Sequence, residues 1–394
     1  MNSHTPVMNS HTPAGQDPAV SAAARPATSL TCGIEEEYLL VDAKTMRPAP
    51  FAVEVRGLAA AEGLATHAEG TPYQVEVATS VAGGVLDLRN ELTRARAVLS
   101  RAAAAHGCRL VAAAVPVLPP EGPLRISFDV PRRRERLDGF GLLTETLASC
   151  GRHVHVGALD LGGAVSASNT VRQWIPTLIA MSANSPFWNG RDTGHASWRT
   201  MAWSSWPSAG LPAHFTSVDH YEQCVGTLIG SGAALDEKMV YWDVRPSPGW
   251  PTVETRAADV TADLDVAVAL AALCRALVEV SRRQGADGRR EIAFPEELLR
   301  LARWRACRDG LEGKALDPRT GLETPATALL ECLVEYVAPH LAAAGDLGLV
   351  TATVDRLRRR GSGAARQRAA YERRRRPEDV VRLLADETEG NAGS

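Results

Sequence analysis

The feature that most constrains this chain is a run of three glutamates inside a segment with the composition of a β-strand, Gly33–Asp42. Alternate side chains of a strand share a face, so we expect Glu35 and Glu37 to point one way and Glu36 the other. Two carboxylates on an interior face cannot both stay ionised without a positive partner, and a hard divalent cation such as Mg²⁺ is the usual partner. Taken alone, the run is also compatible with a solvated edge strand.

Strand segments with metal-binding side chains recur further along the chain. One short strand carries Glu76, with Glu69 just ahead of it. Another, Cys150–Gly157, alternates His153 and His155 with valines, which places both imidazoles on one face. A single histidine on a strand is more often a core residue than a ligand. When two alternating histidines lie beside acidic strands, a metal site and a structural role explain the pattern about equally well.

A predicted β-hairpin brings acids and bases together. Two strand segments flank a Pro-Ser-Pro-Gly turn, with Asp243 and Arg245 alternating on the first and Glu254 and Arg256 on the second. A surface ladder of ion pairs would show the same alternation. Because the hairpin is otherwise apolar, we favour a functional site.

Apolar spacing predicts helices around these strands. Val85–Gly107 has a period near 3.6 and reads as an amphipathic helix packed on a sheet. Residues 171–184 predict a buried helix kinked at Pro176. The remainder is predicted to be helical, over residues 259–283, a segment after Pro295, residues 325–344 and residues 349–387.

Three further segments are predicted to lack regular structure. Residues 1–29 are rich in Ala, Pro and Ser and are predicted to be a disordered leader, and residues 132–136 form an arginine-rich loop. An aromatic loop between residues 184 and 206 carries four of the eight tryptophans and is predicted to cover a site. The rest, residues 30–388, is predicted to be one domain with a helical C-terminal part.

Composition narrows the class of protein. A chain of 394 residues with 45% apolar residues can bury a large core, and a net charge of −3 predicts neither nucleic acid nor a charged membrane surface as a partner. The seven cysteines include no C-x-x-C pair and no segment predicts a membrane span, so we expect a cytoplasmic protein. Lysine is nearly absent and no G-x-x-x-x-G-K-[ST] loop occurs, so arginine and metal would have to meet any phosphate charge.

Taken together, the strands carry a set of candidate metal ligands and a set of arginines. A sheet lined with carboxylates and facing arginines suits two or three Mg²⁺ ions around a triphosphate, because the metals bridge phosphate oxygens while arginines offset the charge that moves in phosphoryl transfer. The candidate ligands are Glu35, Glu37, Glu69, Glu76, His153 and Glu254, and the arginines are Arg199, Arg245 and Arg256.

Several of these stretches together resemble the type 2 glutamate–cysteine ligases, also described as YbdK-like carboxylate-amine ligases. The resemblance runs in consistent order from about residue 31 to 385. It is carried by Gly-Ile-Glu-Glu-Glu-Tyr from Gly33, Glu-Gly-Thr-Pro-Tyr-Gln-Val-Glu ending at Glu76, Cys-Gly-Arg-His-Val-His-Val from Cys150, Asn-Ser-Pro-Phe-Trp-Asn-Gly-Arg-Asp-Thr-Gly from Asn184, Trp-Asp-Val-Arg-Pro-Ser from Trp242 and Thr-Val-Glu-Thr-Arg-Ala-Ala-Asp ending at Asp259.

The resemblance implies an α+β fold, with an antiparallel sheet of glutamine-synthetase-like type, helices packed on it, and ATP and Mg²⁺ on its concave face. Motif by motif, it places metal ligands at Glu35, Glu37, Glu69, Glu76, His153 and Glu254. It places substrate-binding and catalytic arginines at Arg199 and Arg256, and supporting roles at His155, Asp243 and Arg245. Mn²⁺ is an alternative to Mg²⁺, and a homodimer is left open.

The implied activity is that of an ATP-dependent carbon–nitrogen ligase. It would join glutamate to cysteine or another small amine through an acyl phosphate, giving a γ-glutamyl amide, ADP and phosphate. Two alternatives stay open: a metal-dependent hydrolase that uses the same acids, and a γ-glutamyl ligase dedicated to a non-cysteine amino acid in a specialised biosynthetic pathway. Small molecules, not nucleic acid or membrane, are the expected partners.

Overall fold

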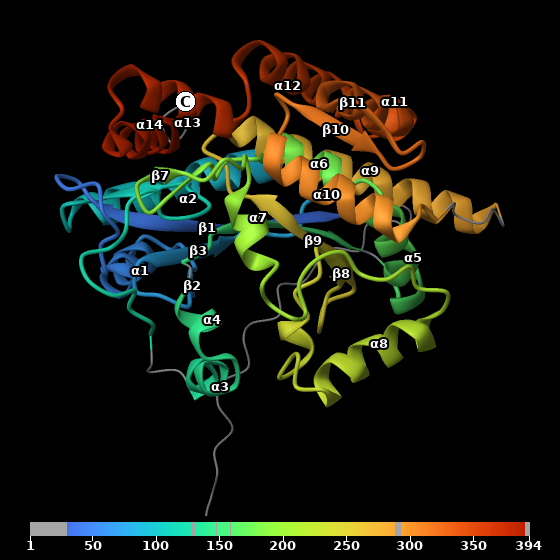
Figure 1. Ribbon diagram of the computed structural model, residues 1–394, viewed down its shortest axis with the longest axis horizontal. Coiled ribbons are helices and arrows are strands. Elements are labelled where there is room, and N and C mark those ends of the chain that lie inside the picture. The colour runs from blue at the N-terminus through green and yellow to red at the C-terminus, as the bar shows by residue number, and fades with distance from the viewer. Residues whose placement is uncertain (1–29, 128–130, 147, 158, 288–292, 391–394) are drawn as a thin grey trace, which may run out of the picture.

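A seven-stranded antiparallel sheet forms the centre of the protein (Figure 1). The computed structural model describes residues 30–127, 131–146, 148–157, 159–287 and 293–390, so the predicted leader at residues 1–29 lies outside the described residues. The strands run in the order β2-β3-β1-β5-β9-β8, and β4 pairs with β1. Their bounds are β1 (Cys32–Asp42), β2 (His67–Ala68), β3 (Gln74–Ala78), β4 (Cys108–Val111), β5 (Gly151–Gly157), β8 (Val244–Pro246) and β9 (Thr252–Asp259).

Helices cover both faces of this sheet. In Figure 1, α6, α9 and α10 lie on one side and α3, α4 and α8 on the other. Two small hairpins accompany them, β6 (Phe187–Trp188) with β7 (Arg191–Asp192), and β10 (Lys314–Asp317) with β11 (Leu322–Pro325). The helices are α1 (Ala52–Ala61), α2 (Val85–Ala104), α3 (Pro131–Phe140), α4 (Leu142–Glu145), α5 (Leu161–Arg172), α6 (Ile175–Ser182), α7 (Trp198–Trp203), α8 (Val218–Gly230), α9 (Leu264–Ala286), α10 (Glu296–Asp309), α11 (Ala326–Ala344), α12 (Leu347–Arg360), α13 (Gly363–Arg374) and α14 (Pro377–Gly390).

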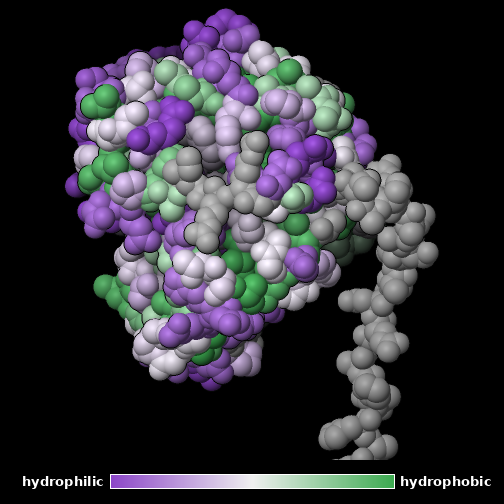
Figure 2. All heavy atoms as spheres, turned by 90° about the vertical axis from the view of Figure 1, so that its right-hand side faces the viewer, coloured by the Kyte–Doolittle hydropathy of each residue, from purple (hydrophilic) through white to green (hydrophobic). Residues whose placement is uncertain are grey.

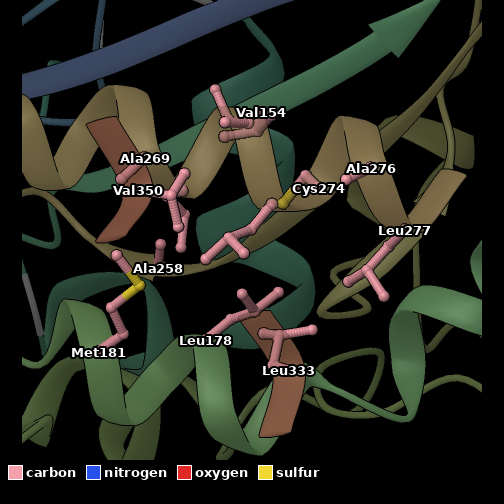
Figure 3. Packing of buried hydrophobic residues seen from close by; sticks show 14 of the residues in the cluster. Val154, Leu178, Met181, Ala258, Ala269, Cys274, Ala276, Leu277, Leu333 and Val350 are labelled. Carbon is pink, nitrogen blue, oxygen red and sulfur yellow. The ribbon is translucent and has the colours of Figure 1, made fainter. Parts of the chain in front are cut away.

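The largest apolar core lies between the sheet and α9. Val154 of β5 packs in one cluster with Cys274 of α9, Leu178 of α6 and Leu333 of α11 (Figure 3). Helix α9 is apolar almost all round and buried along most of its length, as expected of a helix sandwiched between a sheet and further helices. Truncating a side chain such as Leu333 to alanine would cost about 2–5 kcal/mol because neighbours on several elements could not close the cavity together.

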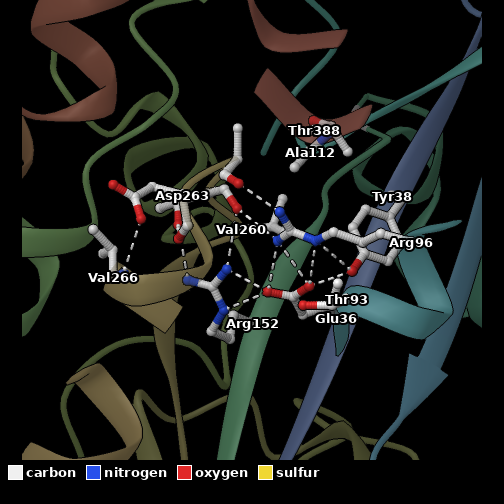
Figure 4. Close-up of polar contacts among 12 residues, drawn as sticks. Glu36, Tyr38, Thr93, Arg96, Ala112, Arg152, Val260, Asp263, Val266 and Thr388 are labelled. Atoms are coloured by element: carbon white, nitrogen blue, oxygen red, sulfur yellow. Dashed lines mark hydrogen bonds and ion pairs between the residues drawn. The ribbon is translucent and has the colours of Figure 1, made fainter. Parts of the chain in front are cut away.

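Glu36 points to the face of the sheet that α9 covers, opposite to Glu35 and Glu37, as predicted from the strand period. Its carboxylate is fully buried and accepts from Arg152 Nε at 2.8 Å and Arg96 Nη2 at 2.9 Å (Figure 4). Tyr38 also donates its hydroxyl to this carboxylate. Burial works to raise the pKa of Glu36, but the two guanidinium groups outweigh it and hold the pKa at about 2. The cluster joins β1, β5 and α2.

Several predicted elements differ from the structure. Residues 132–136, predicted as a loop, lie in helix α3. The prediction was wrong because this segment has too few apolar residues to show a helical period. The buried helix predicted for residues 171–184 is two helices, and Pro176 lies in the first turn of α6, where its missing N–H costs nothing, instead of forming a kink. The helical segments predicted after Asp259 are present as α9, α10, α11 and α12 to α14, but the β10–β11 hairpin between α10 and α11 was not predicted.

The surface is mixed in character. On the face shown in Figure 2, hydrophilic residues are spread widely, with smaller hydrophobic areas between them. Among the described residues, no helix combines the length and the apolar character needed to cross a bilayer.

Candidate active site

Strand register brings the predicted ligands together. Because the strands pair antiparallel, Glu37 of β1 lies opposite Glu76 of β3, and Glu35 lies opposite His153 of β5. One strand further, His155 lies opposite Glu254 of β9. Directly opposed residues have Cβ atoms only about 5 Å apart, so three strand pairings build one acidic surface.

Within this surface, two groups of side chains could each hold a metal ion. The first is Glu35, His153 and Glu254, and the second is Glu37, Glu76 and His153, with ligand atoms in each group within 4.8 Å of one another. His153 belongs to both. Carboxylate oxygens with one imidazole suit Mg²⁺ or Mn²⁺, whereas no thiolate that would favour zinc is among them.

In the second group, burial and like charge together outweigh Arg199 and Arg256, which stabilise the ionised form of Glu37. Burial raises the pKa of both Glu37 and Glu76, and the nearby carboxylate of Glu69 raises them further by like-charge repulsion. The carboxyl groups of Glu37 and Glu76 are therefore each protonated more easily than that of an ordinary glutamate, and a bound cation would take the place of the proton. A divalent cation is the chemical species that such a donor set fits.

In the first group, arginine side chains balance the negative charge of Glu254. Burial works to raise the pKa of Glu254, but Arg256 and Arg245 outweigh it and hold the pKa well below its usual range. Arg245 Nε donates to Glu254 at 2.9 Å, and Arg256 donates to the other carboxylate oxygen. A metal bound to Glu254 would have to share that second oxygen with Arg256.

His153 is the link between the groups. Its Nδ1 lies 3.1 Å from Glu35 Oε2 and 3.7 Å from Glu254 Oε1. Burial lowers the pKa of His153 to about 4, and the charge of Arg256 adds to this effect. The imidazole is therefore neutral at physiological pH, which is the form that binds metals.

The acidic surface forms one wall of a cavity of about 390 Å³. Five of the six predicted ligands and both predicted catalytic arginines line it: Glu35, Glu37, Glu69, Glu76, His153, Arg199 and Arg256. Trp203 and Trp206 of the aromatic segment that was predicted to cover a site also line it. The lining that the sequence did not point to includes Thr71, Gln74, Arg136, Ser149, Lys238 and Tyr241.

Arg199 is positioned by a buried polar network. Its backbone N–H donates to Ser185 Oγ at 3.0 Å, and Ser185 in turn donates to Asp259 at 2.7 Å. Its guanidinium lies against Gly151, and Nη2 is 3.4 Å from the carbonyl oxygen of Arg256. The aromatic segment predicted to cover a site thus contributes Arg199 from α7, followed by Trp203 on the same helix.

The three residues given supporting roles do not line this cavity. Asp243 is turned away from it and bonds Arg303 of α10, with Nε 2.6 Å from Oδ2. Arg245 holds Glu254 and donates to three backbone carbonyls, so its contact with the site is indirect. The alternating hairpin pattern could not distinguish these residues from Arg256, because the partner of Asp243 lies on a helix 60 positions away.

His155 lines a second cavity, which adjoins the first. This cavity of about 310 Å³ has a largely apolar lining that includes Ala78, Val81 and the exposed side chain of Trp250. Glu35 borders both cavities. The Nδ1 atom of His155 lies 3.0 Å from Thr252 Oγ1, and its Nε2 is 3.4 Å from Glu35. The acidic surface therefore separates a polar space from an apolar one.

Comparison with known proteins gives a consistent match along the chain. The sequence model described as Glutamate-cysteine ligase family 2 matches residues 31–386. The "Putative glutamate–cysteine ligase 2-1" of Saccharopolyspora erythraea is 43% identical over 359 residues, which are 91% of this chain and 95% of that protein. The "Putative glutamate–cysteine ligase 2-2" of Mycobacterium sp. (strain KMS) is also 43% identical, over 91% of this chain and 98% of its own.

Solved structures share the fold at low sequence identity. A glutamate–cysteine ligase from Francisella tularensis in complex with AMP superposes with a TM-score of 0.68 at 11% identity, over 93% of this chain and 89% of that one. A bifunctional glutathione synthetase from Pasteurella multocida gives a TM-score of 0.69 at 14% identity, and this chain spans 53% of its length. With the antiparallel sheet and its packed helices, these likenesses confirm the predicted fold class.

Proposed function

This chain belongs to glutamate–cysteine ligase family 2, and on that premise we propose that it joins the side-chain carboxylate of glutamate to the amino group of cysteine or another small amine at the expense of ATP. The observation that carries the proposal is the cavity in which an acidic, imidazole-containing surface faces Arg199 and Arg256. That combination suits a reaction in which phosphate charge moves between a nucleotide and a carboxylate.

The reaction would proceed in two steps. A side-chain carboxylate oxygen of glutamate attacks the γ-phosphorus of ATP, the bond to ADP breaks, and an acyl phosphate forms. The neutral amine then attacks the acyl carbon, loses a proton, and expels inorganic phosphate to leave an amide. No covalent bond to the protein is needed.

We propose that Glu35, Glu37, Glu69, Glu76, His153 and Glu254 hold two or three Mg²⁺ ions, with Mn²⁺ as a substitute. When bound, such ions would neutralise phosphate oxygens and polarise the transferring phosphorus. The raised pKa values of Glu37 and Glu76 support this assignment, because two buried carboxyl groups that repel one another are stabilised by a cation.

We propose that Arg199 and Arg256, which line the same cavity, offset the charge that moves in phosphoryl transfer. Arg256 is held by Glu254 on the same strand, so its guanidinium is fixed in orientation before substrate binds. Arg199 is buried, and the Nε atom of its side chain has no hydrogen-bond partner among the described residues. That leaves it able to donate to a substrate carboxylate or phosphate.

The two adjoining cavities suggest how the substrates are divided. The apolar cavity, with Ala78, Val81 and Trp250, suits a purine base, while the polar cavity suits charged amino acids. Glu35 borders both, so metal ions at the acidic surface would meet the triphosphate between them. We also infer a cytoplasmic location, where ATP is abundant and the seven free cysteines would stay reduced.

The proposal is tested by incubating the purified protein with ATP, Mg²⁺, glutamate and a panel of amino acids and amines, and measuring ADP and product mass. We expect γ-glutamyl products from cysteine and from at least one other small amino acid, because a pocket that reads shape alone gains only about 1–3 kcal/mol per methylene. Ligation of one non-cysteine amino acid alone would identify a dedicated γ-glutamyl ligase instead.

A metal-dependent hydrolase would behave differently in the same experiment. It would consume an amide or ester with Mg²⁺ alone, form no ADP, and show no stabilisation by ATP. Absence of ADP-linked ligation with every pair tested, together with hydrolysis that needs no nucleotide, would overturn the proposed function. A Glu37→Gln variant serves as the matched negative control, since it removes one charged ligand from the acidic surface.

A further inference from the structure

Arg136 lies in the polar cavity on the helical segment that sequence reasoning took for a loop. It belongs to α3, and Phe140 follows one helical turn later on the same face. Phe140 packs against Trp206 with ring centroids 5.2 Å apart. The Arg136 guanidinium lies 5.3 Å from the Trp206 ring and 5.9 Å from the Tyr241 ring. The aromatic contacts therefore hold this cation in a defined place in the wall of the cavity.

In the part of the chain that the structure describes, no carboxylate pairs with this cation. Among the described residues, the Arg136 side chain forms no ion pair, and its Nε atom is buried without a hydrogen-bond partner. Aromatic ring faces stabilise a guanidinium but leave its N–H donors unused. By contrast, Arg256 and Arg245 in the same region are bonded to Glu254. Arg136 is thus a preorganised cation with donors available for a ligand.

The chemistry of the proposed reaction supplies such a ligand. Only the side-chain carboxylate of glutamate reacts, so the α-carboxylate of glutamate, and that of an amino-acid acceptor, must each be accommodated unchanged. An unpaired carboxylate in a partly buried cavity is costly, and a planar guanidinium is its best partner. Arg199 can serve one carboxylate, which leaves a second without an assigned cation.

Resting on the proposed function, we propose that Arg136 binds an unreacting α-carboxylate of an amino-acid substrate and so selects amino acids over amines and acids that lack this group. The rings of Trp206 and Tyr241 orient its planar fork toward the cavity. Arg136 acts on substrate affinity and not on the transferring phosphate, because the acidic surface and Arg256 lie on the sheet and Arg136 lies on α3.

The test compares substrates with and without the carboxylate in wild type, Arg136→Ala, Arg136→Lys and the control Arg134→Ala. Arg134 is exposed on the same helix and does not line the cavity, so its removal matches the change in charge and helix composition. Cysteine is compared with cysteamine as acceptor, and glutamate with 4-aminobutyrate as donor. An analogue that does not turn over is assayed as an inhibitor, and its Ki replaces KM.

We expect Arg136→Ala to raise KM roughly ten- to hundredfold for the amino acid whose carboxylate it binds, with kcat little changed and with no change for the analogue lacking the carboxylate. Arg136→Lys should recover only part of the loss, and Arg134→Ala should match wild type. If KM changes for glutamate, Arg136 binds the donor, and if it changes for cysteine, Arg136 binds the acceptor.

An equal change in KM for each substrate and its analogue, or no change in any arm, would refute the role of Arg136 while leaving the ligase assignment intact. If wild type ligates no donor and acceptor at all, the proposed function itself fails. Thermal melting of each variant identifies any loss of folding, which would alter all arms alike.

Discussion

At the scale of single residues, the acidic surface combines two kinds of carboxylate. Glu254 is already paired with arginines, whereas Glu37 and Glu76 repel one another and Glu69. The second kind makes the metal-free protein less stable than its contacts alone would suggest, and it ties metal binding to pH. This difference leads to a prediction that requires no enzymatic activity.

We expect metal ions to stabilise the protein more at about pH 8 than at about pH 6. Because the pKa values of Glu37 and Glu76 are raised on folding, the folded state binds more protons than the unfolded state, and stability of the metal-free protein falls as pH rises above the ordinary carboxyl range. A bound cation takes the place of those protons. The measurement is the melting temperature with and without Mn²⁺ or Mg²⁺ at both pH values.

The variant Glu76→Gln tests the cause. It should make the metal-free protein more stable near the higher pH, because a neutral amide removes the repulsion, and it should weaken the response to metal. Glu54→Gln, on the exposed face of α1, is the control and should behave as wild type. A metal response in Glu76→Gln equal to that of wild type would remove Glu76 from the ligand set.

At the scale of elements, β1 faces two environments, with the carboxylates of the acidic surface on one side and a buried ion-pair cluster on the other. Glu36 joins β1 to Arg152 on β5 and to Arg96 on α2, while Gly151 at the start of β5 makes room for Arg199 of α7. The site therefore depends on how neighbouring elements pack against this strand. Each of these two contacts yields a prediction.

Glu36→Gln should destabilise the protein by about 3–5 kcal/mol at neutral pH, because it leaves two buried guanidinium groups without a counter-charge. Glu62→Gln, which breaks an exposed pair with Arg101, should cost about 0–1 kcal/mol. Urea denaturation of the three proteins gives these differences.

The effect of Glu36 on stability should depend on pH in a defined direction. Its pKa in the folded protein is about 2, below the ordinary value of 4.5, so its contribution is complete above the ordinary value and is lost as pH falls toward 2. The stability gap between wild type and Glu36→Gln should therefore narrow in acid. A gap that stayed constant down to about pH 3 would show that folding does not lower the pKa of Glu36.

Gly151→Ala should impair substrate binding without unfolding the protein. An added Cβ would lie 2.9 Å from Arg199 Cζ, closer than the two can approach, and the flexible side chain of Arg199 would move away. We expect KM for the amino acid that Arg199 binds to rise about tenfold or more, with a melting temperature close to wild type. Gly57→Ala, at an exposed position of α1, is the matched control, because an added Cβ there would meet no atom within 4 Å. Unchanged kinetics in Gly151→Ala would mean that Arg199 is not needed in its observed position.

At the scale of the whole molecule, the acidic surface stands between a polar cavity and an apolar cavity, and Glu35 borders both. If the nucleotide base and the amino acids occupy different cavities, they do not exclude one another. The division between the two spaces then has a kinetic consequence.

The ATP analogue AMP-PNP should compete with ATP but not with glutamate. Binding of the analogue fills the apolar cavity and leaves the polar one available, so increasing glutamate cannot displace it. Initial-rate measurements at several concentrations of each substrate give the inhibition pattern. Competitive inhibition against glutamate would place both ligands in one space.

A Trp250→Ala variant should raise the KM for ATP alone, since this side chain lines only the apolar cavity.

Much of this arrangement was predictable from the sequence because it rests on local periodicity. The period of two places Glu35 and Glu37 on one face and Glu36 on the other, and β1, β5 and the β8–β9 hairpin appear where their residue patterns predict them. The same period marked His153 and His155 as neighbours on one strand. The roles proposed for these residues came from chemistry and resemblance, and the experiments above test them.

Tertiary structure alone decided which charged groups meet. Asp243, Arg245, Glu254 and Arg256 alternate in the same way, yet packing turns Asp243 to Arg303 and brings Glu254 to His153. Similarly, nothing in the arginine-rich stretch distinguishes Arg136 from Arg134 until α3 packs against Trp206. Periodicity fixes the face on which a side chain lies, but the partner on that face depends on contacts between distant segments, which are set by burial of the common core.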